Sequence, residues 1–178
     1  SQQLQTNKKA STPNLFRFGM VMDLPYEMEK SVYYGRGPIE NYPDRKLSQR
    51  IGRYEQMADD QFYPYIRPQE TGTKGDMRWW KQTDRQGIGL KVVADAPFYA
   101  SATHYTIPDV DDGDRKEQRH SYQLKRSCFT ELYLDGAHAG VGGIDSWSGW
   151  AEALEPYQVK CEDRAFTFWL LPTETVGD

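Results

Sequence analysis

Three carboxylates in turn-rich stretches are the residues whose type could support acid–base chemistry: Glu40, Glu70 and Asp145. A pair of Asp or Glu side chains hydrolyses a glycosidic bond when the two flank that bond. Spacing along the chain does not place any two of these three face to face. A carboxylate in a turn can equally accept hydrogen bonds from backbone N–H groups. The residues alone therefore favour carboxylates that close turns and do not identify a catalytic pair.

Two sequence patterns suggest metal binding, but each lacks the ligands or the spacing that such a site needs. The acidic run 109–114 spaces its carboxylates by two, but a calcium loop needs Gly at the sixth position and Glu at the twelfth. Those positions hold Asp114 and His120. The three histidines, His104, His120 and His138, are scattered, whereas zinc ligands are usually closely spaced. We expect a solvated acidic loop and no metal site.

Composition excludes several classes of function. The net charge of -4 argues against nucleic acid as a partner, because phosphate binding needs a basic surface. No apolar run approaches the roughly 20 residues of a membrane helix, and the N-terminus lacks the apolar stretch of a signal peptide. No nucleophile elbow, phosphate-binding loop, His-Glu-x-x-His or Cys-x-x-Cys motif occurs. We expect a soluble protein, cytoplasmic or periplasmic in a bacterium, with the compartment left open.

Three segments are more specific than ordinary strands and turns. They read GRGPIENYPDR at 35–45, YPYIRPQETG at 63–72 continuing to Arg78-Trp79, and GVGGIDSW at 140–147. In type, order and spacing they resemble the terminal domain of family 2 β-galactosidases, from about Leu15 to Leu171. We refer to them below as the first, second and third motif.

The resemblance implies an all-β fold with little helix, an antiparallel β-sandwich of the galactose-mutarotase-like supersandwich type. In such enzymes the domain follows a catalytic (β/α) barrel and smaller β-domains, and the acid/base and nucleophile glutamates belong to the barrel. The resemblance therefore implies no catalytic residue here. It implies a parent enzyme that hydrolyses terminal β-D-galactosides with retention, with the sugar, the barrel and the other domains as partners. That family commonly uses Mg and Na ions; we expect no cofactor in this chain.

The resemblance also implies that one loop of the domain reaches the mouth of the active site with a tryptophan platform for the sugar. By position in the third motif, that residue is Trp147. The chemistry agrees, since a flat ring can pack on the apolar face of galactose, glycines allow a tight backbone path, and Asp145 and Ser146 can close a turn. Trp150 is a second candidate, and a core role is the alternative for Trp147. Glu70 and Asn41 complete the expected substrate-binding residues.

The chain departs from the family pattern at three places. Residues 71–73 read Thr-Gly-Thr where the family usually has Asn-Gly-Asn, and Ile144 stands where Asp is frequent. After Trp147 the chain continues Ser-Gly-Trp. These changes concern loop contacts and substrate preference rather than the fold.

Short strands must position the motifs. Alternating apolar residues from Leu15 to Leu24 predict a strand with one buried face, and aromatic residues, 13% of the chain, favour sheets. Asp44 could begin one helical turn to Arg50, and Asp135-Gly136 could turn a hairpin. The expected strands cover 15–24, 31–35, 50–57, 76–82, 87–94, 100–105, 120–126, 128–134 and 165–171. Residues 62–67 look extended, but Pro64 and Pro68 favour an edge strand or an irregular loop there.

The chain is expected to form a polar lead-in over residues 1–13 and a single β-sandwich domain over residues 14–178. It lacks an initiator Met and is shorter than the family's terminal domain, which suggests an excised piece whose early strands are missing. A sandwich cut in this way exposes a sheet edge. We expect self-association through that edge, or its coverage by residues 1–13.

The two cysteines, Cys128 and Cys161, lie in apparent strands and are expected to be small buried thiols. A disulfide between them stays an open alternative.

Two other functions remain as alternatives. The first is a stand-alone carbohydrate-binding module that uses the same aromatic surface. The second, by fold analogy alone, is an aldose epimerase, which would need a general acid and base such as His104 or His138 with Glu70.

Overall fold

The computed structural model describes residues 1–7, 12–111, 119–143 and 152–173. The chain is mostly β, with antiparallel sheets of seven and two strands and very little helix, so the expected fold class is confirmed. The strands are β1 (Gln2–Leu4), β2 (Arg17–Pro25), β3 (Lys30–Gly37), β4 (Arg50–Met57), β5 (Lys74–Thr83), β6 (Gly89–Thr103), β7 (Phe129–His138), β8 (Arg164–Phe166) and β9 (Phe168–Pro172). The helices are single turns, α1 (Ala58–Gln61), α2 (Ile107–Val110) and the 3-10 turns Ser121–Gln123 and Glu155–Tyr157.

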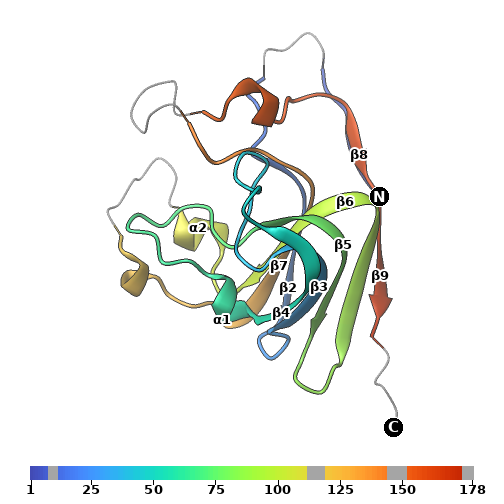
Figure 1. Cartoon of the computed structure of the whole chain (residues 1–178), viewed down its shortest axis with the longest axis vertical. Coiled ribbons are helices and arrows are strands. Elements are labelled where there is room, and N and C mark those ends of the chain that lie inside the picture. The colour runs from blue at the N-terminus through green and yellow to red at the C-terminus, as the bar shows by residue number, and fades with distance from the viewer. Residues whose placement is uncertain (8–11, 112–118, 144–151, 174–178) are drawn as a thin grey trace.

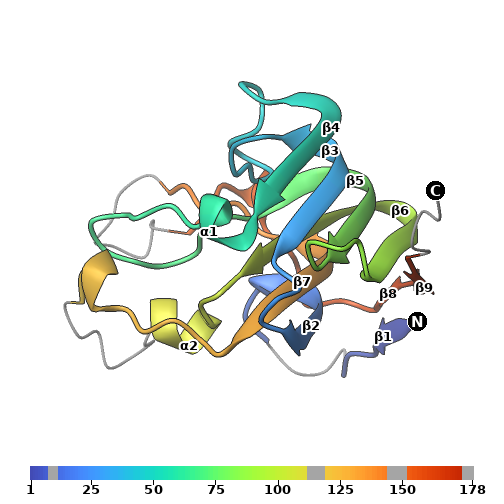
Figure 2. The same cartoon turned by 90° about the horizontal axis from the view of Figure 1, so that it is seen from below.

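The large sheet has the strand order β2-β7-β6-β5-β3-β4, and β9 pairs with β6 beside this path. β6 is long because it serves three neighbours: residues 90–94 pair with β9, residues 99–103 pair with β7, and β5 runs along it. Figures 1 and 2 show α1 and α2 on the opposite side of the molecule from β8 and β9. The loops around α1 carry the second motif.

The core lies on one face of the large sheet. Phe18, Met20, Met22 and Leu24 of β2 pack against it, as the alternating pattern predicts. Its fully buried members are Tyr33, Met77, Trp80, Val92, Phe98, Ala100, Ala102, Leu132 and Leu134, joined by Phe166. At about 25 cal/mol for each Å² of apolar surface removed from water, these large side chains supply the main driving force for folding.

The small sheet lies at the N-terminus. β1 pairs with β8 with Gln3 opposite Ala165, and the N–H and hydroxyl of Thr6 both donate to Asp163 at 2.7 Å. Residues 1–13, which were expected to be a polar lead-in, thus contain the strand β1, which pairs with β8. The strand expected over 165–171 divides at Thr167 into β8 and β9, which pair in different sheets.

Residues 62–67 are an irregular loop, which is one of the two expected alternatives and agrees with Pro64 and Pro68. Three other local expectations are wrong. Residues 44–50 form turns instead of helix, because Tyr42 and Arg45 pair through their backbones around Pro43 and Asp44. Residues 120–126 contain a 3-10 turn, in which the His120 N–H donates to Gln123 Oε1 at 2.7 Å. Residues 135–136 lie inside β7, at an irregular register opposite β2, and turn no hairpin.

The expectation for the cysteines also needs correction. Cys128 is exposed, just before β7, and Cys161 is partly exposed in a loop; both are free thiols.

None of the helices in the described part of the chain is long and apolar enough to cross a membrane.

Candidate functional site

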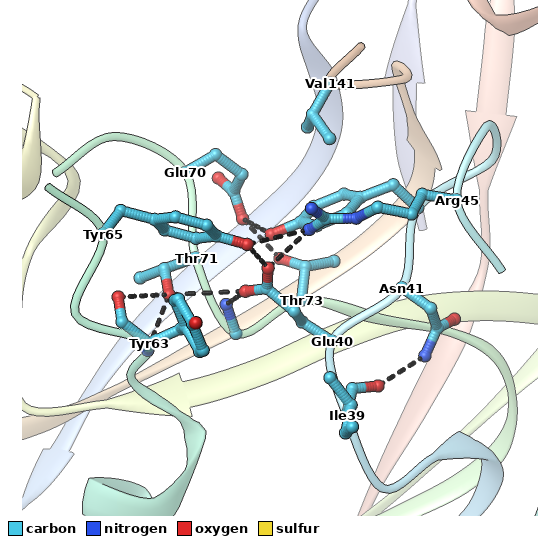
Figure 3. Close-up of polar contacts among 12 residues, drawn as sticks. Ile39, Glu40, Asn41, Arg45, Tyr63, Tyr65, Glu70, Thr71, Thr73 and Val141 are labelled. Carbon is cyan, nitrogen blue, oxygen red and sulfur yellow. Dashed lines mark hydrogen bonds and ion pairs between the residues drawn. The ribbon is translucent and has the colours of Figure 1, made fainter. Parts of the chain in front are cut away.

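Glu40 of the first motif is one centre of a polar cluster that the three motifs build. Its carboxylate accepts hydrogen bonds from the Arg45 guanidinium at 2.5 Å, from the Tyr65 hydroxyl, and from the Gly72 N–H at 2.7 Å. Figure 3 shows the side chains of Arg45 and Tyr65 pointing toward the Glu40 carboxylate. The side chain is nearly buried, so its charge is balanced by donors from the first and second motifs instead of by water.

Glu70 of the second motif is the other centre. It accepts from Thr73 Oγ1 at 2.6 Å, from the Tyr42 hydroxyl at 3.3 Å and from Arg17 at 3.3 Å, and His138 Nε2 lies 3.8 Å away. Burial opposes its ionisation, but His138 and the Arg17 guanidinium outweigh burial and lower the pKa of the Glu70 carboxyl. Glu70 is therefore a buried carboxylate anion.

Tyr42 connects the two centres. Its ring is buried, the Arg45 guanidinium lies 5.3 Å from the ring centroid, and the ring of His138 lies 5.3 Å away. Burial raises the pKa of the Tyr42 hydroxyl well above its usual value, and the nearby Glu70 carboxylate raises it further. Tyr42 therefore acts here as a neutral hydrogen-bond donor.

Asn41 fixes the backbone of the first motif. Its Nδ2 donates to the carbonyls of Arg36 and Ile39 at 3.1 and 3.0 Å, and its Oδ1 accepts from the Gly75 N–H at 3.0 Å. The side chain is buried, and these bonds occupy both donor hydrogens of its amide. Asn41 thus ties the end of β3 to the start of β5.

Lys74 lies beneath the cluster without exposed surface. Its Nζ donates to the Gly72 carbonyl at 2.8 Å and to Gln61 Oε1 at 3.1 Å. Burial lowers the pKa of Lys74 to about 7, although Glu40 partly opposes that shift.

The third motif joins the first through its backbone. The N–H groups of Val141 and Gly142 donate to the Asp44 carboxylate at 3.2 and 2.7 Å. Val141 also appears at the edge of the cluster in Figure 3. Segments almost 100 residues apart therefore meet at one place, which sequence spacing does not reveal.

The structure brings Glu40, Glu70 and Asn41 together from the expected set. The others, Asp145, Ser146, Trp147 and Trp150, lie outside the described residues. Sequence reasoning missed Arg17 and Lys74, which lie outside the motifs, and it considered His138 beside Glu70 only for an epimerase. It also missed the roles of Tyr42, Asp44 and Arg45. Tyr42, Asp44 and Arg45 lie in the first motif, and their place in that motif is the only sequence signal for these roles.

The arrangement holds loops in place and gives no open acid–base pair. The two carboxylates are neutralised by donors from the protein, and the side chain of His138 has no exposed surface. His138 and Glu70 are neighbours, as an epimerase would require, but a sugar cannot reach His138 here.

Neither the acidic run nor the three histidines form a cluster of metal ligands in the described residues. No group of three or more His, Cys, Asp or Glu that could hold an ion occurs in the described ranges. His104 instead stacks on Tyr26 at 4.1 Å and contacts Thr130 and Asp59, each at 3.1 Å. Asp109 belongs to α2, where its carboxylate contacts the hydroxyl of Thr106 at 2.7 Å. Residues 112–114 of the acidic run lie outside the described part.

Comparison with known proteins decides the family. The model of the β-galactosidase small chain matches residues 1–170, nearly the whole chain. The chain belongs to the β-galactosidase small-chain family.

Named relatives agree with this membership. A β-galactosidase of Vibrio cholerae is 38% identical over 136 residues, which are 76% of this chain and 12% of that protein. The β-galactosidase BgaC of Bifidobacterium adolescentis is 34% identical over 158 residues, 87% of this chain and 14% of that protein. A β-galactosidase of Halalkalibacterium halodurans is 30% identical over 167 residues, 92% of this chain and 16% of that protein. This small-chain segment thus spans 12% to 16% of the length of these relatives.

Proposed function

We propose that this chain is a non-catalytic portion of a β-galactosidase and contributes an aromatic loop to its sugar-binding pocket. In this proposal Trp147 stacks on the galactosyl ring, Asp145 and Ser146 shape the loop, and the catalytic glutamates lie outside the chain. The parent enzyme hydrolyses terminal β-D-galactosides. Its barrel and other domains are the partners of this chain, which holds no metal or cofactor of its own.

The observation that carries the proposal is the junction between the first and third motifs. The backbone of Val141 and Gly142 is bonded to Asp44, immediately before the segment that contains Trp147. A flat ring contributes to binding only when it is held in place, because a mobile loop must lose conformational entropy on binding. The cluster around Glu40 and Glu70 supplies a rigid base.

Glu70 and Asn41 were expected to contact substrate, and we propose that they contribute by holding the base of the pocket. Their polar atoms bond to Thr73, Tyr42 and the backbone of residues 36, 39 and 75. Contact with substrate would require some of these bonds to be exchanged.

We propose further that an exposed apolar edge mediates self-association. Among the described strands, β9 pairs with β6 alone, and it carries Trp169, Leu170 and Leu171, which are 50%, 45% and 44% exposed. An unpaired strand edge with apolar side chains favours contact with another chain.

The test of the sugar platform is Trp147→Ala in the complete β-galactosidase that carries this chain. Loss of a stacked ring costs about 1 kcal/mol, so we expect KM for a chromogenic β-galactoside to rise about fivefold. Trp169→Ala is the matched control, since Trp169 lies in β9, and KM should stay unchanged. Equal KM values for wild type and Trp147→Ala would reject the platform.

The isolated chain separates the alternatives. It should not hydrolyse the chromogenic galactoside, and hydrolysis would contradict a non-catalytic role. Titration with galactose or lactose distinguishes the carbohydrate-binding module: millimolar binding that Trp147→Ala abolishes would favour that module over an incomplete pocket.

A further inference from the structure

The Asp44 carboxylate of the first motif binds the backbone of the third motif. Each of its two carboxylate oxygens accepts one N–H, Oδ1 from Val141 at 3.2 Å and Oδ2 from Gly142 at 2.7 Å. A carboxylate that accepts two successive backbone N–H groups forms charge-assisted bonds, which are stronger than bonds between neutral groups. The contact therefore fixes the direction of the chain at residues 141–142.

The glycines of the third motif fit this contact. A Cβ on Gly140 would lie 2.6 Å from Asp44 Oδ2 and 2.9 Å from Tyr157 Cβ, and one on Gly142 would lie 3.0 Å from Oδ2. Real Cβ atoms do not approach so closely, so any side chain at residue 140 would push the carboxylate away. Glycine here permits close approach of the backbone to Asp44.

Asp44 is itself held in position. It occupies the third place of a β-turn closed by the bond from Arg45 N–H to the Tyr42 carbonyl at 2.9 Å, with Pro43 at the second place, where proline is favoured. Tyr42 is buried against Glu70, and Arg45 is bonded to Glu40. The two buried carboxylates therefore fix the residues on either side of the Pro43-Asp44 pair.

Residues 153–158 are attached to the start of the third motif. The Gly140 N–H donates to the Tyr157 carbonyl at 2.8 Å, and Gln158 Nε2 donates to the Ala153 carbonyl at 2.8 Å. The described backbone before and after residues 144–151 is therefore linked through Gly140 and Tyr157.

We propose that Asp44 is a positioning residue for sugar binding, which acts by clamping the N–H groups of Val141 and Gly142 and so orienting the loop that carries Trp147. This role rests on the proposed function of Trp147. Asp44, in the Pro-Asp pair of the first motif, thereby affects substrate affinity although it does not touch the sugar.

The first experiment measures the clamp alone, in the isolated full chain. Amide hydrogen exchange of Val141 and Gly142, followed by NMR, should become at least tenfold faster in Asp44→Ala. Asp44→Asn keeps one acceptor oxygen and should restore part of the protection. Unchanged exchange at both amides in Asp44→Ala would overturn the proposal.

Asp84 provides the matched control. Its Oδ1 accepts the N–H groups of Gln86 and Ile88, both at 2.9 Å, in the turn between β5 and β6. Asp84→Ala should accelerate exchange in that turn and leave Val141 and Gly142 unchanged. Faster exchange at both places in either variant would indicate general loosening and reject a local clamp.

The second experiment uses the complete β-galactosidase. We expect Asp44→Ala to raise KM several-fold with kcat changed less, and to add little in the Trp147→Ala background, because both changes remove the same interaction. A purely structural role predicts less folded enzyme, unchanged KM and additive effects, and that result would overturn the proposal. If Trp147→Ala itself leaves KM unchanged, the sugar platform fails, while amide exchange still decides whether the clamp exists.

Discussion

At the scale of single residues, the buried ammonium of Lys74 is the most unusual group. A long cationic side chain without exposed surface is rarely found unless it is paired. Here its hydrogen-bond partners are neutral, the Gly72 carbonyl and the Gln61 amide, and both can accept from an uncharged amine. This explains how the folded chain tolerates Lys74 with a pKa of about 7.

Stability should depend on pH through this lysine. The unfolded chain keeps the Lys74 proton up to about pH 10.4, whereas the folded chain releases it above about pH 7. Between these values the unfolded state binds more protons, so the free energy of unfolding should rise with pH, by at most about 1.4 kcal/mol per pH unit. Urea unfolding at pH 7.5, 8.5 and 9.5 would measure this slope.

Lys74→Met tests the cause, because it cannot titrate. The rise in stability over this pH range should be smaller in Lys74→Met than in wild type. Lys125→Met, at an exposed loop position, should keep the wild-type slope. The same slope in all three proteins would show that Lys74 keeps its ordinary pKa.

At the scale of elements, β7 shows how packing overrules a turn signal. Asp135 and Gly136 form a typical turn pair, yet β7 runs through them to His138. Asp135 is buried, and Arg17 of β2 donates to it at 2.5 Å. Gly136 faces the ring of Phe166, which a Cβ would approach to 2.7 Å. A salt bridge and a core aromatic ring thus require strand at a sequence that favours a turn.

Gly136→Ala should therefore destabilise the fold by overpacking. We expect a loss of about 1–3 kcal/mol in the free energy of unfolding, since the Phe166 ring must move within a filled core. Chemical denaturation of Gly136→Ala, Phe166→Leu and the double variant measures the coupling. The smaller leucine should relieve part of the cost; strict additivity would mean that the ring does not limit residue 136.

At the scale of the whole molecule, the exposed edge at β9 should govern association. Trp169→Ser with Leu171→Ser removes much of the apolar edge that β9 presents, whereas Ile66→Ser removes an 88% exposed side chain from a loop. We expect light scattering at rising concentration to show association of wild type and of Ile66→Ser, and weaker association of the β9 variant. A monomeric wild type over the whole range would contradict self-association through this edge.

The whole molecule also explains why the motifs are spread along the chain. The first begins at the end of β3, the second leads into β5, and the third follows β7. β3 pairs with β5, and β6 joins β5 to β7, so the sheet brings these loops to a common cluster. A segment spanning 12% to 16% of the length of its relatives thus assembles this cluster from its own strands and loops.

The sequence by itself determined the family, the all-β class and the strands with regular alternation, such as β2. These features depend on the local pattern of side chains and on the motifs, and both follow from the order of residues. Tertiary structure alone decided that Glu40 and Glu70 are buried carboxylates bonded across the motifs, that β1 completes a sheet with β8, and that residues 135–136 are strand. Each of these depends on a partner far away in sequence, such as Gly72 for Glu40, Arg17 for Asp135 or Gln3 for Ala165. The energy of a hydrogen bond or a packed ring depends on distance in space, which residue order does not give.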